Sequence, residues 1–499
     1  MKSLIPTLLL VTLGAALGCG GGTTTTNPPP PPPPTANANV AVSNSTNGGF
    51  DLAMSTSFQP AEWDYTFFQN LPSAVTPLAN LQPSHIRLQT VSKGVPQDTA
   101  TTWDFSFLDA ITQPVLTVGD HSPELQLGWA PSFMWSGGGT SGTLDANAFT
   151  SYAQNMVRYY NKGGFTSLDN AFHVSPSYPN QKITWWGILN EPSINGFNSA
   201  TAAADYTAVY NQVVPAMQAV DPTIKFAALE LCCGTEDWVQ TFAANVNAQV
   251  DVLATHYYSS CNQRDTDAQV FNTVPSFATS VQQIYTYLSA NPALANVPVW
   301  ITENNVNADF GNGSGGSACN PGQAFVLDRR GSSAFFAAWR PYVFSQVGKA
   351  GTQLLHHWDF NADAQFGEVD YNTGNTQLSY WVDYWLERYF PAGTGQKLLN
   401  YTNTNNAQIE VLPVLNTDGS VVVMVSNHAV ASFSDNNGAG LTANVSINTS
   451  SLGSFSSASK LVIDSTTSAT TGPTASSISP SSSINLTLNG YGVAFIKLQ

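Results

Sequence analysis

Short apolar runs and longer amphipathic segments alternate along the chain from about residue 50 to residue 390. Eight apolar runs have the length of buried β-strands and stand at Phe50–Met54, His85–Leu88, Leu125–Trp129, Ile183–Leu189, Ile224–Leu229, Val250–His256, Val297–Thr302 and Gln353–Trp358. Helical spacing of apolar residues marks segments between or after them at Phe149–Tyr160, Ala202–Val220, Val281–Leu288, Ser333–Val347 and Leu378–Phe390. This alternation predicts a parallel sheet, and eight repeats predict a closed (β/α)8 TIM barrel of the α/β class.

The pattern changes near Gly393, where helical spacing ends and Ser, Thr and Asn become frequent. Runs typical of short strands follow at Gln408–Leu412, Ser420–Val425, Leu441–Ile447 and Gly492–Leu498. Asp418-Gly419 stands between two of these runs and is a hairpin signal. The sequence therefore predicts a barrel over residues 40–395 and a C-terminal β-sandwich over residues 396–499.

The N-terminal residues have the features of an export signal and a tether. Leu4–Leu17 is an apolar stretch of signal-peptide length, and Cys19 follows small residues that resemble a bacterial lipobox, although Ala16 stands where Leu is usual. We expect residues 1–19 to be a signal peptide with a lipid anchor at Cys19, and residues 20–39, rich in Gly, Thr and Pro, to be a low-complexity tether. Ordinary signal-peptidase cleavage is the alternative. Both readings place the protein outside the cytoplasm, as a membrane-anchored lipoprotein or a secreted protein.

Composition and charge exclude two classes of protein. Hydrophobic residues make up 42% of the 499 residues and aromatic residues 11%, which is ample for a large core and excludes a wholly disordered chain. Charged residues make up only 10% and the net charge is −16. Binding to nucleic acid needs a concentration of Lys and Arg that this chain lacks, so no nucleic-acid partner is expected. Nothing in the sequence implies a protein partner.

Cysteine and histidine spacing gives no sign of a metal site. Four cysteines remain after Cys19, and an even number suggests disulfides in an oxidising compartment. The pairings that we expect are Cys261–Cys319, or one of these two with Cys232 or Cys233. No zinc motif is present, and His356-His357 would point apart on a strand, so we expect no metal and no cofactor.

Two glutamates follow apolar runs at positions where a carboxylate is unusual. The chain has nine glutamates; Glu191 closes the fourth run within Trp185–Pro192, and Glu303 closes the seventh within Val299–Asn305. The C-terminal ends of barrel strands are where such barrels carry their catalytic residues. Two carboxylates that flank a glycosidic bond are what retaining glycoside hydrolysis requires, one to protonate the leaving oxygen and one to attack the anomeric carbon. A lone Glu191 would also fit a helix cap, but Glu303 occurs independently on the expected strand.

At these motifs the chain resembles clan A of the glycoside hydrolases, whose members are retaining (β/α)8 enzymes. The resemblance extends over residues of about 50–390 and rests on Asn190-Glu191-Pro192 and Thr302-Glu303. It implies that Glu191 is the acid/base, Glu303 the nucleophile, and Asn190 the residue that holds the sugar 2-hydroxyl. It also implies substrate-binding roles for Arg87 beside the nucleophile, for His256 and Tyr258 on the sixth strand, with Tyr257 as the competitor by register, and for Trp358 as the floor of a subsite.

Within the clan, a barrel followed by a sandwich resembles families 39, 30, 51 and 79. The segment Trp186-Gly187-Ile188-Leu189-Asn190-Glu191-Pro192 is most similar to family 39, which includes β-xylosidases and related exo-enzymes. That family usually has Trp after the nucleophile, whereas this chain has Asn304. The resemblance therefore implies a carbohydrate substrate and leaves the sugar open.

Other polar and aromatic residues near strand ends have two interpretations each. Glu230 ends the fifth run and is a candidate for substrate binding, and Trp129 ends the third run as either a sugar platform or a core residue. His121 and Glu124 precede the third run and are expected at the surface. The Gly-, Asn- and Ser-rich segment 307–320 is expected to border the cleft, with Cys319 holding it.

Three functions are consistent with these patterns. The first is a retaining glycoside hydrolase that acts on plant or microbial polysaccharide or oligosaccharide. The second is a surface lipoprotein that binds glycan without cleaving it, and the intact Glu191 and Glu303 pair argues against it. The third is a structural surface lipoprotein that uses the sandwich for adhesion. Turnover of aryl glycosides separates the first function from the other two.

Overall fold

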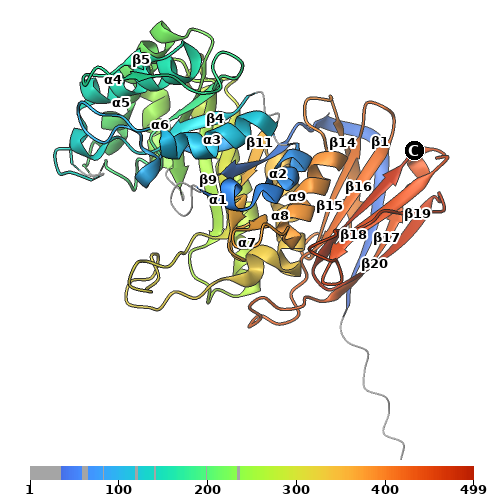
Figure 1. Ribbon diagram of the computed structural model, residues 1–499. Helices are drawn as coiled ribbons and strands as arrows, with labels where there is room; N and C mark the ends of the chain where they lie inside the picture. The colour runs from blue at the N-terminus through green and yellow to red at the C-terminus, as the bar shows by residue number, and fades with distance from the viewer. Residues whose placement is uncertain are drawn as a thin grey trace, which may run out of the picture. The chain divides into compact units, whose positions relative to one another are not determined.

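Eight parallel strands form a closed barrel, which confirms the predicted (β/α)8 fold (Figure 1). The computed structural model describes residues 35–499 apart from 59–65, 83, 119–121, 140–141, 198 and 233–235. The predicted signal peptide, most of the tether, Cys19, His121 and Cys233 lie outside the described residues. In order around the barrel the strands are β10 (Val299–Asn307), β11 (Leu354–His357), β2 (Ala53–Phe58), β3 (Arg87–Gln89), β4 (Glu124–Leu127), β7 (Trp185–Ile188), β8 (Lys225–Cys232) and β9 (Val252–Ser260).

Helices follow the barrel strands along the chain. They are α1 (Phe67–Asn70), α2 (Val75–Leu81), α3 (Ser106–Val118), α4 (Ala146–Asn161), α5 (Ala202–Val220), α6 (Glu236–Asn245), α7 (Asp267–Ser289), α8 (Ala334–Lys349) and α9 (Leu378–Tyr389). Short 3₁₀ turns lie at Pro72–Ala74, Ser92–Gly94, Ser132–Met134, Arg329–Ser332 and Ser450–Leu452. Helix α7 begins well before the predicted Val281, because a capping box of Thr266 and Gln269 starts it and Pro275 is accommodated inside it.

The remaining strands form one large sheet and two small ones. The large sheet has nine strands in the order β19 (Ser476–Ile478), β18 (Ala458–Asp464), β21 (Gly492–Leu498), β16 (Val421–Asn427), β15 (Ile409–Leu415), β14 (Lys397–Asn403), β1 (Thr35–Gly49), β17 (Thr442–Asn448) and β20 (Ser483–Asn489). The small pairs are β5 (Phe165–Thr166) with β6 (Phe172–His173), and β12 (Asn361–Ala362) with β13 (Val369–Asp370). Apolar residues from both halves of the large sheet share one core, which confirms the predicted β-sandwich.

The sandwich has a strand that the sequence boundaries assign elsewhere. Strand β1, blue in Figure 1, lies between β14 and β17, antiparallel to the first and parallel to the second. Residues 35–39 therefore do not belong to the tether, and residues 40–49 do not belong to the barrel. The signal is a period of two: Ala36, Ala38, Val40 and Val42 are buried in the sandwich core, and the residues between them are exposed or partly exposed. Small alanines in an Asn-rich stretch hide this alternation.

Strand β16 joins the sandwich to the barrel helices through its two faces. Its odd-numbered valines, Val421, Val423 and Val425, lie in the sandwich core, while Val422 and Met424 pack in the cluster that contains helix α8. Polar contacts support the same junction, since Glu410 of β15 accepts a hydrogen bond of 2.6 Å from Lys349 of α8. Strand β16 is therefore buried on both faces, and its sequence begins with a continuous apolar run.

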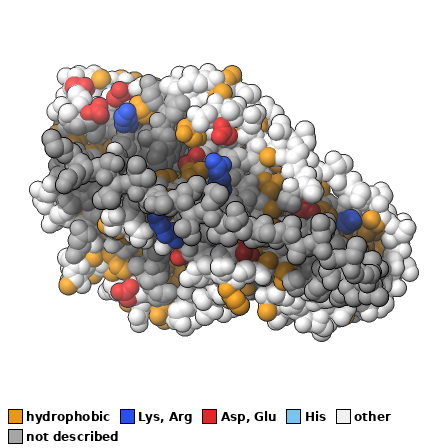
Figure 2. Space-filling view, turned by 90° about the horizontal axis from the view of Figure 1, so that it is seen from below, with side chains coloured by type: hydrophobic (Ala, Val, Ile, Leu, Met, Phe, Trp, Pro, Cys, Tyr) orange, Lys and Arg blue, Asp and Glu red, His pale blue; other side chains and the backbone are white. Residues whose placement is uncertain are grey.

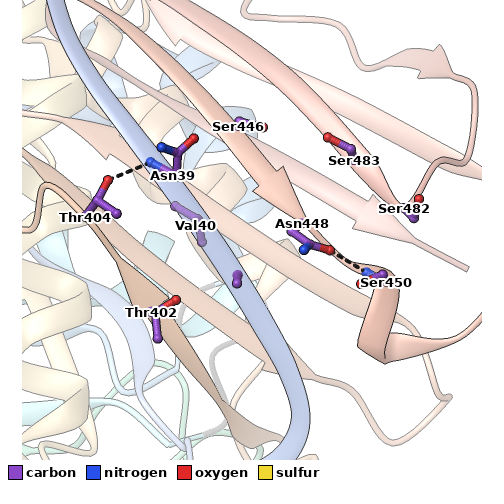
Figure 3. Close-up of a pocket in the computed structure, with 10 residues that line it drawn as sticks. Asn39, Val40, Thr402, Thr404, Ser446, Asn448, Ser450, Ser482 and Ser483 are labelled. Atoms are coloured by element: carbon purple, nitrogen blue, oxygen red, sulfur yellow. Dashed lines mark hydrogen bonds between the residues drawn. The ribbon is translucent and has the colours of Figure 1, made fainter.

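The exposed face of β14, β1, β17 and β20 carries many Asn, Ser and Thr side chains. Asn39, Thr402, Ser446, Asn448 and Ser483 line a shallow hollow of about 520 Å³ on it (Figure 3). The molecular face in Figure 2 likewise shows few, scattered charged side chains, in keeping with the low charged fraction. Among the described residues, none of the helices has the length and apolar character needed to cross a membrane.

Candidate active site

Glu191 and Glu303 meet inside the barrel. Glu303 lies near the middle of the long strand β10, just beyond Trp300 and Ile301, which pair with β11, and Glu191 follows β7 by three residues. A carboxylate oxygen of Glu191 lies within 4.8 Å of one of Glu303, and a ring nitrogen of His256 lies within the same distance of both. The Glu191 side chain is 20% exposed and that of Glu303 is 7% exposed, so both are reachable from the barrel mouth.

Arg87 fixes one oxygen of Glu303 from below. Its guanidinium is completely buried, and Nη1 donates a hydrogen bond of 2.9 Å to Oε1 of Glu303. Nη2 donates to Asn190 and Gln126, at 2.9 Å each, and to Glu230 at 3.3 Å. Burial by itself would lower the pKa of Arg87, but the carboxylates of Glu230 and Glu303 raise it further above its usual range. Arg87 is therefore a permanent cation in direct contact with Glu303.

Two hydrogen bonds to the side-chain oxygen orient Asn190, and its side-chain amide nitrogen is left to bind a ligand. Oδ1 accepts from Arg87 at 2.9 Å and from Nε2 of Gln126 at 3.1 Å. Gln126 was not among the predicted site residues; the signal for it is one polar residue at an inward position within the apolar run of β4. Gly187 makes room for it, because a Cβ there would lie 2.5 Å from Cγ of Gln126.

His256 connects the two candidate catalytic carboxylates to a third one. Its Nδ1 lies 3.0 Å from Glu191 and 3.5 Å from Glu303, and its Nε2 lies 3.2 Å from Glu230. Burial would lower the pKa of His256, but the charge of Glu303 and hydrogen bonds to Glu191 and Glu230 raise it to about 9. His256 is therefore an imidazolium at neutral pH and donates from both nitrogens.

Tyr258, rather than Tyr257, faces Glu303. The Tyr258 hydroxyl donates a hydrogen bond of 2.8 Å to Oε2 of Glu303. Tyr257, one residue earlier on β9, points to the other side, where its ring stacks on Phe277 and its hydroxyl contacts Ser259. Alternation along the strand thus resolves the choice of register that the sequence leaves open.

Glu230 and Glu124 lie beneath the site and are fully buried. Glu230 therefore contacts the residues that hold the catalytic pair rather than an open cleft. Its Oε2 accepts from Thr302 at 2.5 Å, and although burial opposes its charge, Arg87 and His256 hold its pKa far below the usual range. The expectation that Glu124 is exposed is wrong, because this residue opens β4 with its side chain inside the barrel. Burial raises its pKa well above normal, which keeps Glu124 neutral.

The backbone is strained where these residues leave their strands. Leu189, Glu191, Leu229 and Glu230 all have positive φ, at 62°, 46°, 79° and 49°. Strand pairing also shifts between Ala228 and Leu231 on β8 and between Ile301 and Glu303 on β10. The Tyr206 hydroxyl bridges the two strained ends, since it donates to Ile188 O and accepts from Leu229 N, both at 3.0 Å. Such local departures change the direction of the side chains that follow a strand.

The two predicted tryptophans lie on different sides of the mouth. Trp129 is partly buried after β4 and lines a hollow of about 240 Å³. Trp358 is partly buried after β11, where its backbone N–H donates to Asn304 O at 3.1 Å, next to Glu303. Trp358 also lines a separate pocket of about 300 Å³.

Among the residues that the structure describes, two groups of side chains bring possible metal-ligand atoms within 4.8 Å of one another: Glu191, His256 and Glu303 at the site, and His357, Glu368 and Asp383 elsewhere. A buried arginine already contacts each group. Arg87 binds Glu303 in the first group, and Arg340 lies 2.9 Å from Asp383 in the second. This environment disfavours a further cation, and we assign no metal to either group. His356 and His357 do point apart, to His85 O and to Asp383.

The raised pKa of His256 predicts a pH-dependent stability. A folded-state pKa of about 9 against 6.5 means that this contribution is complete below pH 6.5 and is lost as pH rises through 9. Glu230→Gln should lower the free energy of unfolding by about 3–5 kcal/mol, because it leaves Arg87 and His256 with one carboxylate fewer. It should also shrink the loss of stability between pH 6.5 and 9. Denaturant unfolding at four pH values measures both effects.

The control is Asp205→Asn in the exposed first turn of α5, which should keep the wild-type pH dependence. A Glu230→Gln variant that loses as much stability as the wild type across this pH window would show that Glu230 does not hold the proton on His256.

The fold and this site define the class of the protein as a glycoside hydrolase, an enzyme that hydrolyses O-glycosyl bonds. The family model described as glycosyl hydrolases family 39 matches residues 86–327 of this chain. The match confirms the resemblance inferred from the motifs. It includes Arg87, Glu191, His256 and Glu303, and it ends before Trp358.

Solved structures with the same fold come from three families of the clan. A monomeric β-xylosidase from Caulobacter crescentus is 15% identical, with a TM-score of 0.62 over 93% of this chain and 99% of its own. A family 51 arabinofuranosidase from Xanthomonas axonopodis pv. citri is 11% identical, with a TM-score of 0.62 over 93% and 100%. A family 30 xylanase from Clostridium acetobutylicum is 15% identical, with a TM-score of 0.57 over 93% and 99%. No curated protein matches the sequence significantly. At these identities the structural likeness establishes the fold.

Proposed function

We propose that the protein is a retaining glycosidase that cleaves plant or microbial polysaccharide or oligosaccharide by double displacement. The observation that supports it is the separation of the two carboxylates, whose nearest oxygens lie within 4.8 Å. Retaining enzymes have carboxyl groups about 5–5.5 Å apart, whereas inverting enzymes need about 6.5–9.5 Å to admit a water molecule. In this proposal Glu303 attacks the anomeric carbon, and Glu191 protonates the departing oxygen.

The charges around the pair suit these two roles. Arg87 and His256 are buried cations, and both contact Glu303 and the buried Glu230. Glu191 lies 3.0 Å from His256 and is the more exposed of the two candidate catalytic glutamates, which suits a group that must reach the leaving oxygen. Once Glu303 is bonded to the sugar its charge is lost, and Glu191 is free to act as the base that activates water.

The stereochemical outcome tests the mechanism. We expect turnover within a panel of aryl glycosides, namely β-xyloside, β-glucoside, β-galactoside, β-mannoside and α-arabinofuranoside. The β-xyloside and the α-arabinofuranoside are the first substrates to test, because similar folds occur in a β-xylosidase, an arabinofuranosidase and a xylanase. A product NMR time course should show the anomer of the substrate first. Inverted product would overturn the proposal.

We further propose that the enzyme is exported and anchored through Cys19, with the following Gly/Thr/Pro stretch as spacer. Cys19→Ala should therefore move the enzyme from the membrane fraction to the soluble fraction, because it removes the site of lipidation. Immunoblots of both fractions measure the shift. Cys319→Ala is the control, because it removes a cysteine that is bonded to Cys261 within the fold, and this variant should stay in the membrane fraction. Wild-type enzyme that is already fully soluble would disprove the anchor.

A further inference from the structure

The segment of β10 that carries Glu303 is paired less regularly with its neighbouring strands than the segment before it. The pairing of β10 with β11 includes Trp300 and Ile301, and Glu303 lies beyond these pairs. On the other side of β10, the register with β9 shifts between Ile301 and Glu303. Such an irregularity bends a strand and changes the direction of the side chain that follows it. The direction of the Glu303 side chain therefore depends on contacts beyond the sheet pairing.

Asn304, the next residue, anchors this segment on the outer side of the barrel. It is completely buried, and because side chains alternate along a strand it points away from the side on which Glu303 contacts Arg87. Its Nδ2 donates a hydrogen bond of 2.6 Å to Tyr257 O on β9, and its Oδ1 accepts one from Nη1 of Arg340 on helix α8. Asn304 thus joins the strand of the candidate nucleophile to a neighbouring strand and to a helix.

Arg340 and Asp383 form a buried ion pair behind Asn304. Nε and Nη2 of Arg340 donate to the two carboxylate oxygens of Asp383 on helix α9, at 2.9 and 3.2 Å. Nδ1 of His357 lies 3.0 Å from the same carboxylate and holds it from β11. The two-point contact fixes the plane of the guanidinium, and the third nitrogen of Arg340 is thereby directed to Asn304.

We propose that Arg340 and Asp383 are positioning residues that fix the direction of the Glu303 side chain. They act through Asn304, which links the ion pair to β10. Burying an ion pair adds little net stability, because desolvation offsets the attraction, so a geometric role explains this pair better than a stabilising one. The proposal rests on the glycosidase function proposed above, in which Glu303 is the nucleophile.

The inner face of β10 shows what this positioning protects. Glu303 accepts hydrogen bonds from Arg87 at 2.9 Å and from Tyr258 at 2.8 Å, and a turn of the β10 backbone would disturb both contacts. A reacting group must be held close to its productive geometry, and a misplacement of about 1 Å can cost a factor of about 10² in rate. The buried pair on the helices therefore acts on the reaction without touching the sugar.

Asn304→Ala tests this role, with Asn161→Ala as the matched control. Asn161 is a buried residue of α4 whose Nδ2 donates at 2.8 Å to Ile183 O, ahead of β7. Both substitutions remove a buried amide that holds a backbone carbonyl, so both should lower the free energy of unfolding. Asn304→Ala should also lower kcat for an aryl glycoside about 10- to 100-fold at a nearly unchanged KM, because Asn304 does not face the sugar. Wild-type kcat in Asn304→Ala, or an equal fall in the control, would overturn the proposal.

Arg340→Lys tests the helix end of the link. A lysine keeps a positive charge beside Asp383 but has a single nitrogen, so it cannot hold Asp383 and Asn304 with the same fork. We expect kcat to fall as in Asn304→Ala, and the double variant to lose no more than the worse of the two single variants. Losses that multiply would show that the two residues act independently. Wild-type kcat in Arg340→Lys would overturn the proposal even if Asn304→Ala does not fold.

Crystal structures of the wild type and of Asn304→Ala give a reading without turnover. We expect the variant to lose at least one of the hydrogen bonds that Glu303 accepts from Arg87 and Tyr258. If both contacts are the same in the two structures, the positioning role is wrong whatever the activity. A wild-type enzyme that cleaves none of the aryl glycosides would overturn the glycosidase function instead, and the two crystal structures would still decide the positioning role.

Discussion

Glu303→Gln should reduce turnover of every glycoside by a factor on the order of 10⁴ or more, because the amide cannot form the covalent glycosyl-enzyme. The substitution keeps the shape of the side chain. The amide oxygen of the glutamine can still accept the hydrogen bond from Arg87, which in the wild type is 2.9 Å long and ends on the Glu303 carboxylate. The loss should therefore appear in kcat even for aryl glycosides with excellent leaving groups. Stopped assays with such substrates, combined with an unfolding curve of the variant, measure it.

Glu387→Gln on helix α9 is the matched control. Glu387 accepts a hydrogen bond of 3.1 Å from the Met54 N–H, which a glutamine also satisfies, and it lies outside the catalytic cluster. Full activity in this variant and a folded but inactive Glu303→Gln enzyme would assign the nucleophile. Substantial activity in Glu303→Gln would assign it elsewhere.

The meeting of Glu191, Glu303 and Arg87 could be predicted from the sequence because a closed barrel brings its strands together around one interior. These three residues lie far apart in the chain, yet each stands on or directly after a separate apolar run, and parallel strands place the corresponding parts of these runs side by side. Tyr258 required the structure, because two adjacent tyrosines on one strand differ only in the face they occupy. The sequence predicts Glu230 as a carboxylate at the end of an apolar run, but it does not predict that Glu230 is fully buried.

Residues that act from inside the barrel could not be predicted in the same way. Glu124 looks like a surface residue beside a strand start, and only the barrel interior shows that its neutral form is accommodated near Arg87 and Glu230. Gln126 alternates with leucines on the same short strand as Glu124, and its role depends on Asn190, which lies 64 residues later. The roles of Glu124 and Gln126 depend on contacts between strands, and the periodicity of a single strand does not predict such contacts.

The predicted boundary of the sandwich was wrong for a different reason. Strand β1 pairs with β14 and β17, which lie far along the chain, as the Val40–Asn403 pair illustrates. Its buried face is half alanine, so its hydrophobic signal is weak beside the neighbouring polyproline segment. Long-range pairing thus completes the sheet with a segment that local composition places in the tether.

Glu191→Ala should separate the two steps of the proposed reaction. Without the general acid, kcat/KM for natural glycosides should fall by about 10²–10⁴, whereas aryl glycosides with good leaving groups need no proton and should still react in the first step. The intermediate then persists, because the base that activates water is also missing. The truncated side chain leaves space next to His256, whose Nδ1 now lies 3.0 Å from Glu191, and a small anion such as azide can enter there.

Azide should therefore restore turnover and give a glycosyl azide with the anomeric configuration of the substrate, a β-azide from a β-glycoside. Glu191→Gln is the control, because it removes the acid while filling the space, and azide should not rescue it. NMR of the azide product identifies the configuration. An inverted azide, or equal rescue of both variants, would mean that Glu191 does not stand on the leaving-group side of the sugar, and the assignment of the two carboxylates would have to be reversed or abandoned.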